Sequence, residues 1–154
     1  MGRRRIVSDR VRISLLSHEE TFQFGVKLAG SCQPNTVIAL SGDLGAGKTT
    51  LVQGIALGLG IQEAIQSPTF VYLNVHLSGR LPLYHFDLYR LVGWDAFMQA
   101  GFWEYLEAGG ITVLEWPERA AGFLPAHTSK IELVRVGTGR EVIFDPCSVD
   151  KIPV

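Results

Sequence analysis

The sequence predicts an α/β domain of three layers with a mixed, mostly parallel β-sheet. Residues 37–40 form a short apolar run that ends in a glycine-rich turn and is followed by a helical pattern. Residues 111–114 form a second apolar run, of the kind that is buried on both faces of a parallel sheet. Two hairpin patterns, over residues 70–87 and 131–144, make the predicted sheet mixed.

Length and composition predict one domain over residues 1–154. The chain has 154 residues, of which 47% are hydrophobic and 19% charged, so it can bury a core and is not a disordered chain. Its formal net charge of -1 gives no overall field that favours nucleic acid or a membrane. No apolar run approaches the roughly 18 residues that cross a bilayer, and the basic start is not followed by the apolar segment of a secretory signal. We expect a cytoplasmic protein in which Cys32 and Cys147 are reduced structural thiols.

The first nine residues are expected to form a flexible terminus. Five of the 14 lysines and arginines lie in or near it: Arg3, Arg4, Arg5, Arg10 and Arg12. Two interpretations are open, a solvated and partly disordered terminus or an arm that touches RNA.

The first regular elements are a strand and a helix. Alternation over residues 11–15 predicts the strand. Ser17 and Glu20 have the S-x-x-E spacing of a capping box, which predicts that a helix starts there and ends near Gly30.

A phosphate-binding loop opens the second helix. Residues Gly42 to Thr49 match the pattern G-x-x-x-x-G-K-[ST] between an apolar strand and a helix. Phosphate oxygens need backbone N–H groups at close range, and glycines at 42, 45 and 47 remove the Cβ atoms that would block this approach. The N-terminus of the helix adds free N–H donors and partial positive charge. Lys48 is expected to reach the β- and γ-phosphates, and the Thr49 hydroxyl to ligate Mg²⁺.

The later elements follow from turn signals and apolar runs. They are a hairpin with strands at 70–76 and 82–87, short helices at 93–99 and 102–107, a strand at 111–114, a short helix to about Phe123, and a closing hairpin with strands at 131–136 and 141–144.

A phosphate loop needs an acidic partner for its metal, and in such folds this residue usually ends a strand beside the loop. Two carboxylates fit this position. Glu115 follows the apolar run 111–114, and Asp87 follows the run 83–86. Either could bind Mg²⁺ directly or through water, and either could orient the attacking water.

Other polar residues near these acids have two open interpretations each. Strand alternation puts His85 on the face of Asp87, either as a partner of the site or as a packed core histidine. Arg90 could neutralise transition-state charge or form a surface ion pair. Ser67 and Thr69 could reach the γ-phosphate or form a plain turn.

Four stretches together resemble the bacterial TsaE family, also called YjeE. They are Gly42-Asp-Leu-Gly-Ala-Gly-Lys-Thr-Thr50, Ser67-Pro-Thr-Phe70, His85-Phe-Asp-Leu-Tyr-Arg90 and Leu114-Glu-Trp-Pro-Glu118, and the likeness extends from about residue 17 to 143. The resemblance implies a small cytoplasmic P-loop ATPase that acts in making the N6-threonylcarbamoyl group on adenosine 37 of tRNAs that read ANN codons. Family members work with the TsaB and TsaD proteins, so tRNA would be met through that complex.

The resemblance also implies a set of site residues. The expected cofactors are ATP and Mg²⁺. The catalytic residues would be Lys48, Asp87 and Glu115, and the metal ligands Thr49 and Glu115. The nucleotide would be contacted by Gly42, Asp43, Leu44, Gly45, Ala46, Gly47, Lys48, Thr49, Thr50, Trp116 and Arg140. The aromatic stretch over residues 93–101 departs from the acidic, leucine-rich helix expected there.

Three alternative functions use the same loop. A small-molecule kinase needs an acceptor pocket and an arginine-bearing lid, for which 154 residues leave little room. A GTPase switch needs a guanine-reading Asn-Lys-x-Asp stretch, which is absent from the sequence. An assembly factor whose hydrolysis is incidental would resemble a slow ATPase in isolation.

Overall fold

A computed structural model describes residues 4–7, 10–120 and 122–145. The sequence-based expectations for Arg3 and Cys147 fall outside these residues. Cys32 is buried, and its thiol donates to the Leu28 carbonyl at 3.3 Å.

The described residues form one sheet of eight strands in the order β1-β2-β8-β7-β3-β6-β5-β4. The strands are β1 (Arg4–Val7), β2 (Arg10–Leu15), β3 (Val37–Ser41), β4 (Leu73–His76), β5 (Leu83–Asp87), β6 (Ile111–Glu115), β7 (Ser129–Val136) and β8 (Gly139–Phe144). The neighbours β7, β3, β6 and β5 are parallel. The remaining pairs, β1–β2, β2–β8, β7–β8 and β4–β5, are antiparallel. The sheet is therefore mixed, as predicted, but its parallel part is confined to the adjacent strands β7, β3, β6 and β5, so the antiparallel pairings are the more numerous, four to three.

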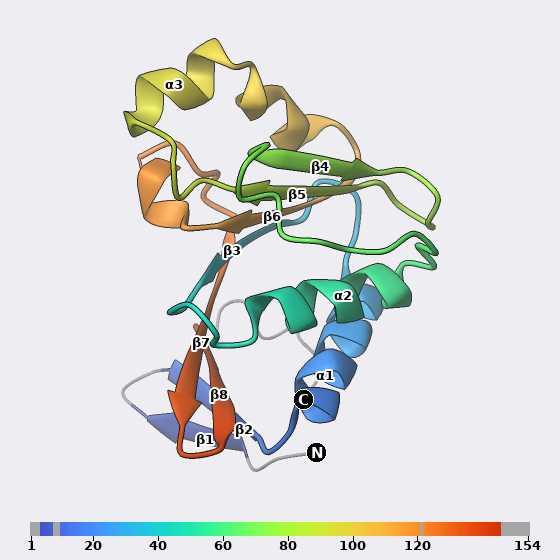
Figure 1. The fold of residues 1–154 in the computed structure, drawn as a ribbon, viewed down its shortest axis with the longest axis vertical. Coiled ribbons are helices and arrows are strands. Elements are labelled where there is room, and N and C mark those ends of the chain that lie inside the picture. Colours follow the sequence, from blue (N-terminus) through green and yellow to red (C-terminus); the bar gives the residue numbers. More distant parts are fainter. Residues whose placement is uncertain (1–3, 8–9, 121, 146–154) are drawn as a thin grey trace.

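Helices cover both faces of this sheet, which confirms the three-layer α/β fold. The helices are α1 (His18–Ser31), α2 (Lys48–Gly58) and α3 (Gly93–Gln99), with 3₁₀ helices η1 (Phe102–Glu107) and η2 (Pro117–Ala120). Figure 1 shows α1 and α2 together on one side of the sheet, and α3 with the chain that follows it on the other.

Two separate apolar cores follow from strand alternation. In β3, Ile38 and Leu40 belong to the core under α1 and α2, whereas Val37 belongs to the core under α3 and η1. Leu83 and Phe86 of β5 divide between the two cores in the same way. β3 and β6 are thus buried on both faces, which explains their largely apolar sequences, whereas β7 alternates between buried and more exposed residues.

The caps and boundaries of α1 confirm the capping box. The Glu20 N–H donates to the Ser17 hydroxyl at 3.1 Å, and the Glu20 carboxylate accepts from the Leu16 N–H. The first contact satisfies a donor that the first turn of a helix leaves unpaired, whereas the second reaches the residue before the N-cap rather than the Ser17 N–H of an ideal capping box.

The structure differs from expectation at the start of the chain. Residues 4–7 form β1 and pair antiparallel with β2, whereas the sequence analysis placed them in a flexible terminus. The open edge of β2 supplies unpaired backbone groups that a neighbouring segment can satisfy, and charge composition does not reveal this edge. No helix among the described residues is long and apolar enough to span a membrane.

Candidate functional site

The phosphate loop connects β3 to α2 through three left-handed glycines. Gly42, Gly45 and Gly47 have φ angles of 148°, 78° and 103°, which side chains with a Cβ rarely adopt. A Cβ on Gly42 would also lie 2.6 Å from the Leu133 carbonyl oxygen of β7. The loop thus has the bare backbone of a phosphate cradle, and α2 begins directly after Gly47.

Lys48 lies at the mouth of this loop with little contact with solvent. Its side chain is 7% exposed, and its Nζ donates to the Gly42 carbonyl at 2.6 Å. The same Nζ lies 4.5 Å from the centroid of the Trp116 ring. A buried ammonium group held by a carbonyl and an aromatic face is well suited to bind an anion.

Sheet register places the two candidate carboxylates beside each other and beside the loop. Asp87 ends β5 and Glu115 ends β6, and these residues are register partners, as are Leu40 and Glu115 on the loop's own strand. Glu115 is 3% exposed and Asp87 4% exposed. The carboxyl ends of parallel strands therefore bring two buried acids to the edge where ligands bind in open α/β sheets.

Glu115 is held by His85. The His85 Nε2 lies 2.6 Å from Glu115 Oε2, and the histidine is fully buried. This contact resolves the alternatives for His85, because the ring packs in the core and also orients a carboxylate of the site.

Asp87 is held by the segment before β4 and by the chain after β5. The Thr69 hydroxyl lies 3.0 Å and the Ser67 hydroxyl 3.4 Å from Asp87 Oδ2, while the Tyr89 N–H donates to Oδ1 at 3.0 Å. Both carboxylate oxygens thus have hydrogen-bond partners. Ser67 and Thr69 are more than a plain turn, because they join the site through Asp87.

These side chains line one cleft of about 370 Å³. Its lining residues are His18, Leu44, Gly45, Gly47, Lys48, Thr49, Thr50, Ser67, Thr69, Asp87, Glu115 and Trp116. The hydroxyl and carboxylate oxygens of Thr49, Glu115 and Asp87 are the hard ligands that Mg²⁺ prefers, so the donor set fits that ion. No group of three or more His, Cys, Asp or Glu side chains among the described residues is arranged to hold a metal ion by itself, and Mg²⁺ bound beside phosphates needs only one or two protein carboxylates.

The structure leaves four of the expected nucleotide contacts outside the lining of this cleft. Ala46 is buried, Asp43 is exposed, and Gly42 presents its carbonyl to Lys48. Arg140 lies on the outer side of the loop, where its guanidinium donates to the carbonyls of Ala46 at 2.8 Å and Gly45 at 3.1 Å.

A small hollow between α1 and the β7–β8 turn adjoins the cleft. It is lined by Ser17, His18, Thr21, Gly47, Thr138, Gly139 and Arg140. His18 and Gly47 line both the hollow and the cleft. The sequence analysis did not assign His18, because nothing local shows which loop the first turn of α1 will face.

Arg90 does not line the cleft. Its guanidinium carbon lies 4.4 Å from the centroid of the Phe70 ring, and both residues are exposed. Trp116 lies where the sequence analysis expected it, beside the cleft, with a φ angle of 57° that is unusual for a residue with a side chain.

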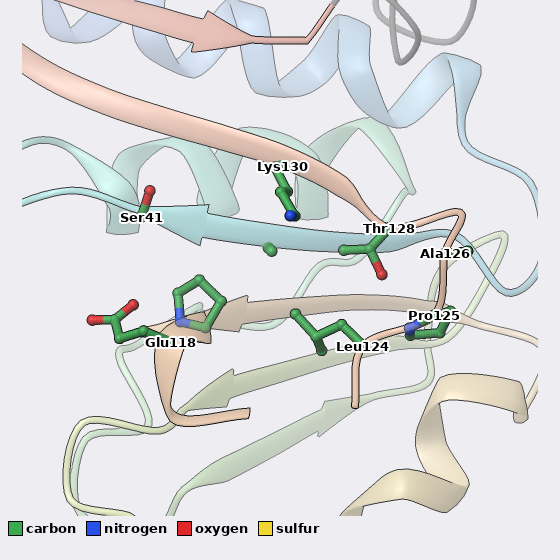
Figure 2. Close-up of a pocket in the computed structure, with 9 residues that line it drawn as sticks. Ser41, Glu118, Leu124, Pro125, Ala126, Thr128 and Lys130 are labelled. Atoms are coloured by element: carbon green, nitrogen blue, oxygen red, sulfur yellow. The ribbon is translucent and has the colours of Figure 1, made fainter. Parts of the chain in front are cut away.

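A second cavity lies on the face of β3 that carries Ala39 and Ser41 (Figure 2). It has a volume of about 410 Å³ and is lined by Ala39, Ser41, Pro117, Glu118, Leu124, Pro125, Ala126, Thr128 and Lys130. None of these residues lines the first cleft.

Comparison with known proteins identifies relatives of this chain. Residues 15–142 match the family model described as threonylcarbamoyl adenosine biosynthesis protein TsaE. The chain is 43% identical over 127 residues to the tRNA threonylcarbamoyladenosine biosynthesis protein TsaE of Treponema pallidum, covering 82% of this chain and 93% of that protein. It is 39% identical over 127 residues to the protein of the same name from Bacillus subtilis, covering 82% and 79%.

A solved structure agrees with these sequence matches. The crystal structure of Bacillus subtilis YdiB superposes with a TM-score of 0.75 at 32% sequence identity, covering 94% of this chain and 87% of that one. The fold and the sequence comparisons thus point in the same direction.

Proposed function

This chain belongs to the TsaE family of tRNA threonylcarbamoyladenosine biosynthesis proteins, and we propose that within this process it binds Mg·ATP in the cleft and hydrolyses it. It would act in the cytoplasm with the TsaB and TsaD proteins, supporting formation of the N6-threonylcarbamoyl group on adenosine 37 of tRNAs that read ANN codons. The observation that carries the proposal is the convergence of Lys48, Thr49, Asp87 and Glu115 on one cleft beside the glycine loop.

The phosphates would be held by the loop and Lys48. Backbone N–H groups of the loop and of the first turn of α2 would meet phosphate oxygens. The Ala46 N–H is not one of them, because it donates to the Asp43 carbonyl at 3.0 Å. The Lys48 ammonium would exchange its bond to the Gly42 carbonyl for phosphate oxygens and stabilise charge that develops on the γ-phosphate and the leaving group.

Thr49 and Glu115 would hold Mg²⁺. The ion would supply charge neutralisation at the phosphates. His85 fixes one oxygen of the Glu115 carboxylate, which leaves the other oxygen for the ion or its water. Asp87, whose oxygens bond to Thr69 and Tyr89, would orient the attacking water or the water around the ion.

The nucleoside would extend toward the hollow beside His18 and Arg140. This hollow opens next to Gly47, so it lies beyond the phosphate loop on the side of α1. Arg140 would contribute mainly by holding the Gly45 and Ala46 carbonyls away from the phosphates. Because trans peptide groups point N–H opposite to C=O, the bond to the Ala46 carbonyl favours a Gly47 N–H that faces away from Arg140.

The tRNA would be met through the partner proteins. A net charge of -1 supplies little of the phosphate-neutralising charge that RNA binding requires.

Binding and modification experiments test this proposal. Calorimetric titration with ATP in Mg²⁺ should show one site, and Lys48→Ala should abolish it while thermal unfolding stays cooperative. In a reconstituted reaction with TsaB, TsaD and tRNA, the modified nucleoside should form with ATP and not with a non-hydrolysable analogue. Unchanged ATP affinity and turnover in Lys48→Ala would overturn the site, and modification that proceeds without this chain would overturn its role.

A further inference from the structure

The cavity in Figure 2 lies beneath the strand that carries the phosphate loop and is separate from the nucleotide cleft. Ala39 and Lys130 are register partners on the parallel strands β3 and β7, and they form its floor. The opposite wall is formed by Pro117 of η2 and by Leu124 and the residues after it. At about 410 Å³ it is within the size range of small-molecule sites.

Two polar groups in this cavity have no partner among the described residues. The Thr128 Oγ1 atom is buried without a hydrogen bond in the structure. Lys130 is a solvent-exposed side chain at the cavity, and it forms no ion pair with any other described residue. Figure 2 shows the Lys130 ammonium and the Thr128 hydroxyl pointing into the space above Leu124. Buried polar atoms are rarely left unpaired, so this hydroxyl indicates a missing partner.

The charges of the cavity select among ligands. One ammonium group and one hydroxyl match a singly charged carboxylate, which accepts hydrogen bonds from both. A phosphate dianion would need more cationic charge than one lysine supplies, and Glu118 on the same wall would repel the dianion more strongly than a singly charged carboxylate. The remaining surface is apolar, since it comes from Ala39, Pro117, Leu124, Pro125 and Ala126.

We propose that this cavity binds a small organic monocarboxylate with a short apolar body. The carboxylate accepts from the Lys130 ammonium and the Thr128 hydroxyl, and the apolar body packs against Leu124 and Pro117. The site adjoins the nucleotide cleft through the backbone, because Ser41 precedes the first loop glycine and Pro117 follows Trp116. The proposal is independent of ATP hydrolysis.

Hexanoate is a suitable probe, with hexanol and hexylamine as matched ligands of the same length. Titration into the intact chain, followed by two-dimensional NMR, should shift the signals of Ala39, Leu124 and Thr128 saturably. Hexanoate should bind about tenfold more tightly than hexanol or hexylamine, because only the carboxylate pairs with Lys130. Shifts confined to residues 45–49 would place the anion in the phosphate loop and overturn the proposal.

Two variants test the polar contacts. Lys130→Gln should weaken hexanoate about tenfold and leave hexanol unchanged, whereas Lys27→Gln, at an exposed lysine of α1, should change neither. Thr128→Val should also weaken hexanoate, yet it should not lower the melting temperature, because the hydroxyl has no partner to lose. Equal affinity for hexanoate and hexanol, or unchanged hexanoate affinity in Lys130→Gln, would contradict the proposal.

Discussion

The Thr69 hydroxyl lies 3.0 Å from Asp87 Oδ2, which ties the segment before β4 to the carboxyl end of β5. The next two residues, Phe70 and Val71, have exposed apolar side chains. Asp87 therefore both lines the cleft and holds the Ser67–Val71 segment through the hydroxyls of Ser67 and Thr69.

Thr69→Val tests this anchor. Loss of a hydrogen bond to a buried carboxylate should increase amide hydrogen exchange over residues 67–71 by about tenfold. Mass spectrometry of exchange measures the effect. Thr112→Val is the matched control. It also removes a threonine hydroxyl, but the Thr112 hydroxyl donates to the Tyr105 carbonyl and does not line the cleft. Equal exchange in the wild-type chain and Thr69→Val would show that Asp87 does not hold the segment.

A second prediction concerns His85 and Glu115. His85→Leu leaves a buried carboxylate without its partner, so we expect ATP binding to require about tenfold more Mg²⁺ and the protein to lose about 1–3 kcal/mol of stability. His85→Gln retains an N–H donor on a flexible side chain and should recover part of both losses. Calorimetry over a range of Mg²⁺ concentrations and chemical unfolding measure the two effects.

The chain offers a control for this experiment. His76 is also buried beside a carboxylate, with its Nδ1 3.1 Å from Glu63 Oε1, but it lies outside the cleft. His76→Leu should therefore leave the Mg²⁺ dependence unchanged. A His85→Leu variant with the Mg²⁺ dependence of the wild-type chain would contradict the assigned role of Glu115.

A third prediction concerns the pKa of Glu63. The Ser78 hydroxyl, the Glu63 backbone N–H and His76 hold the pKa of this carboxyl below its ordinary value, and Ser78 is the largest cause. Ser78→Ala should raise the pKa toward that of an ordinary glutamate, which carboxyl NMR titration measures. Because the folded pKa is lowered, these contacts stabilise the protein above the ordinary pKa and lose their effect as pH falls through the lowered one. The melting temperatures of the two proteins should thus converge in acid.

The sequence predicted the local parts of the site because each has a local cause. The phosphate loop follows from its glycine spacing, and the strands before Glu115 and Asp87 follow from apolar runs. Their placement in one cleft required only that parallel strands end at the same edge of a sheet.

The parts that sequence reasoning did not predict depend on tertiary contacts. The bonds from Arg140 to the loop carbonyls join residues 94 and 95 positions apart. The contribution of His18 depends on how α1 packs against α2, and β1 depends on the open edge of β2. Residues 102–107 form a 3₁₀ helix where a short helix was predicted, a distinction that side-chain patterns do not carry.

ATP hydrolysis by the purified chain in Mg²⁺ buffer, with and without the cognate TsaB and TsaD proteins, tests the central claim most directly. Hydrolysis should be slow alone and strongly stimulated by the pair, and Lys48→Ala should show neither activity. Absence of stimulation by partners shown to be folded and competent would contradict the proposed role in the complex, and hydrolysis that survives in Lys48→Ala would contradict the site itself.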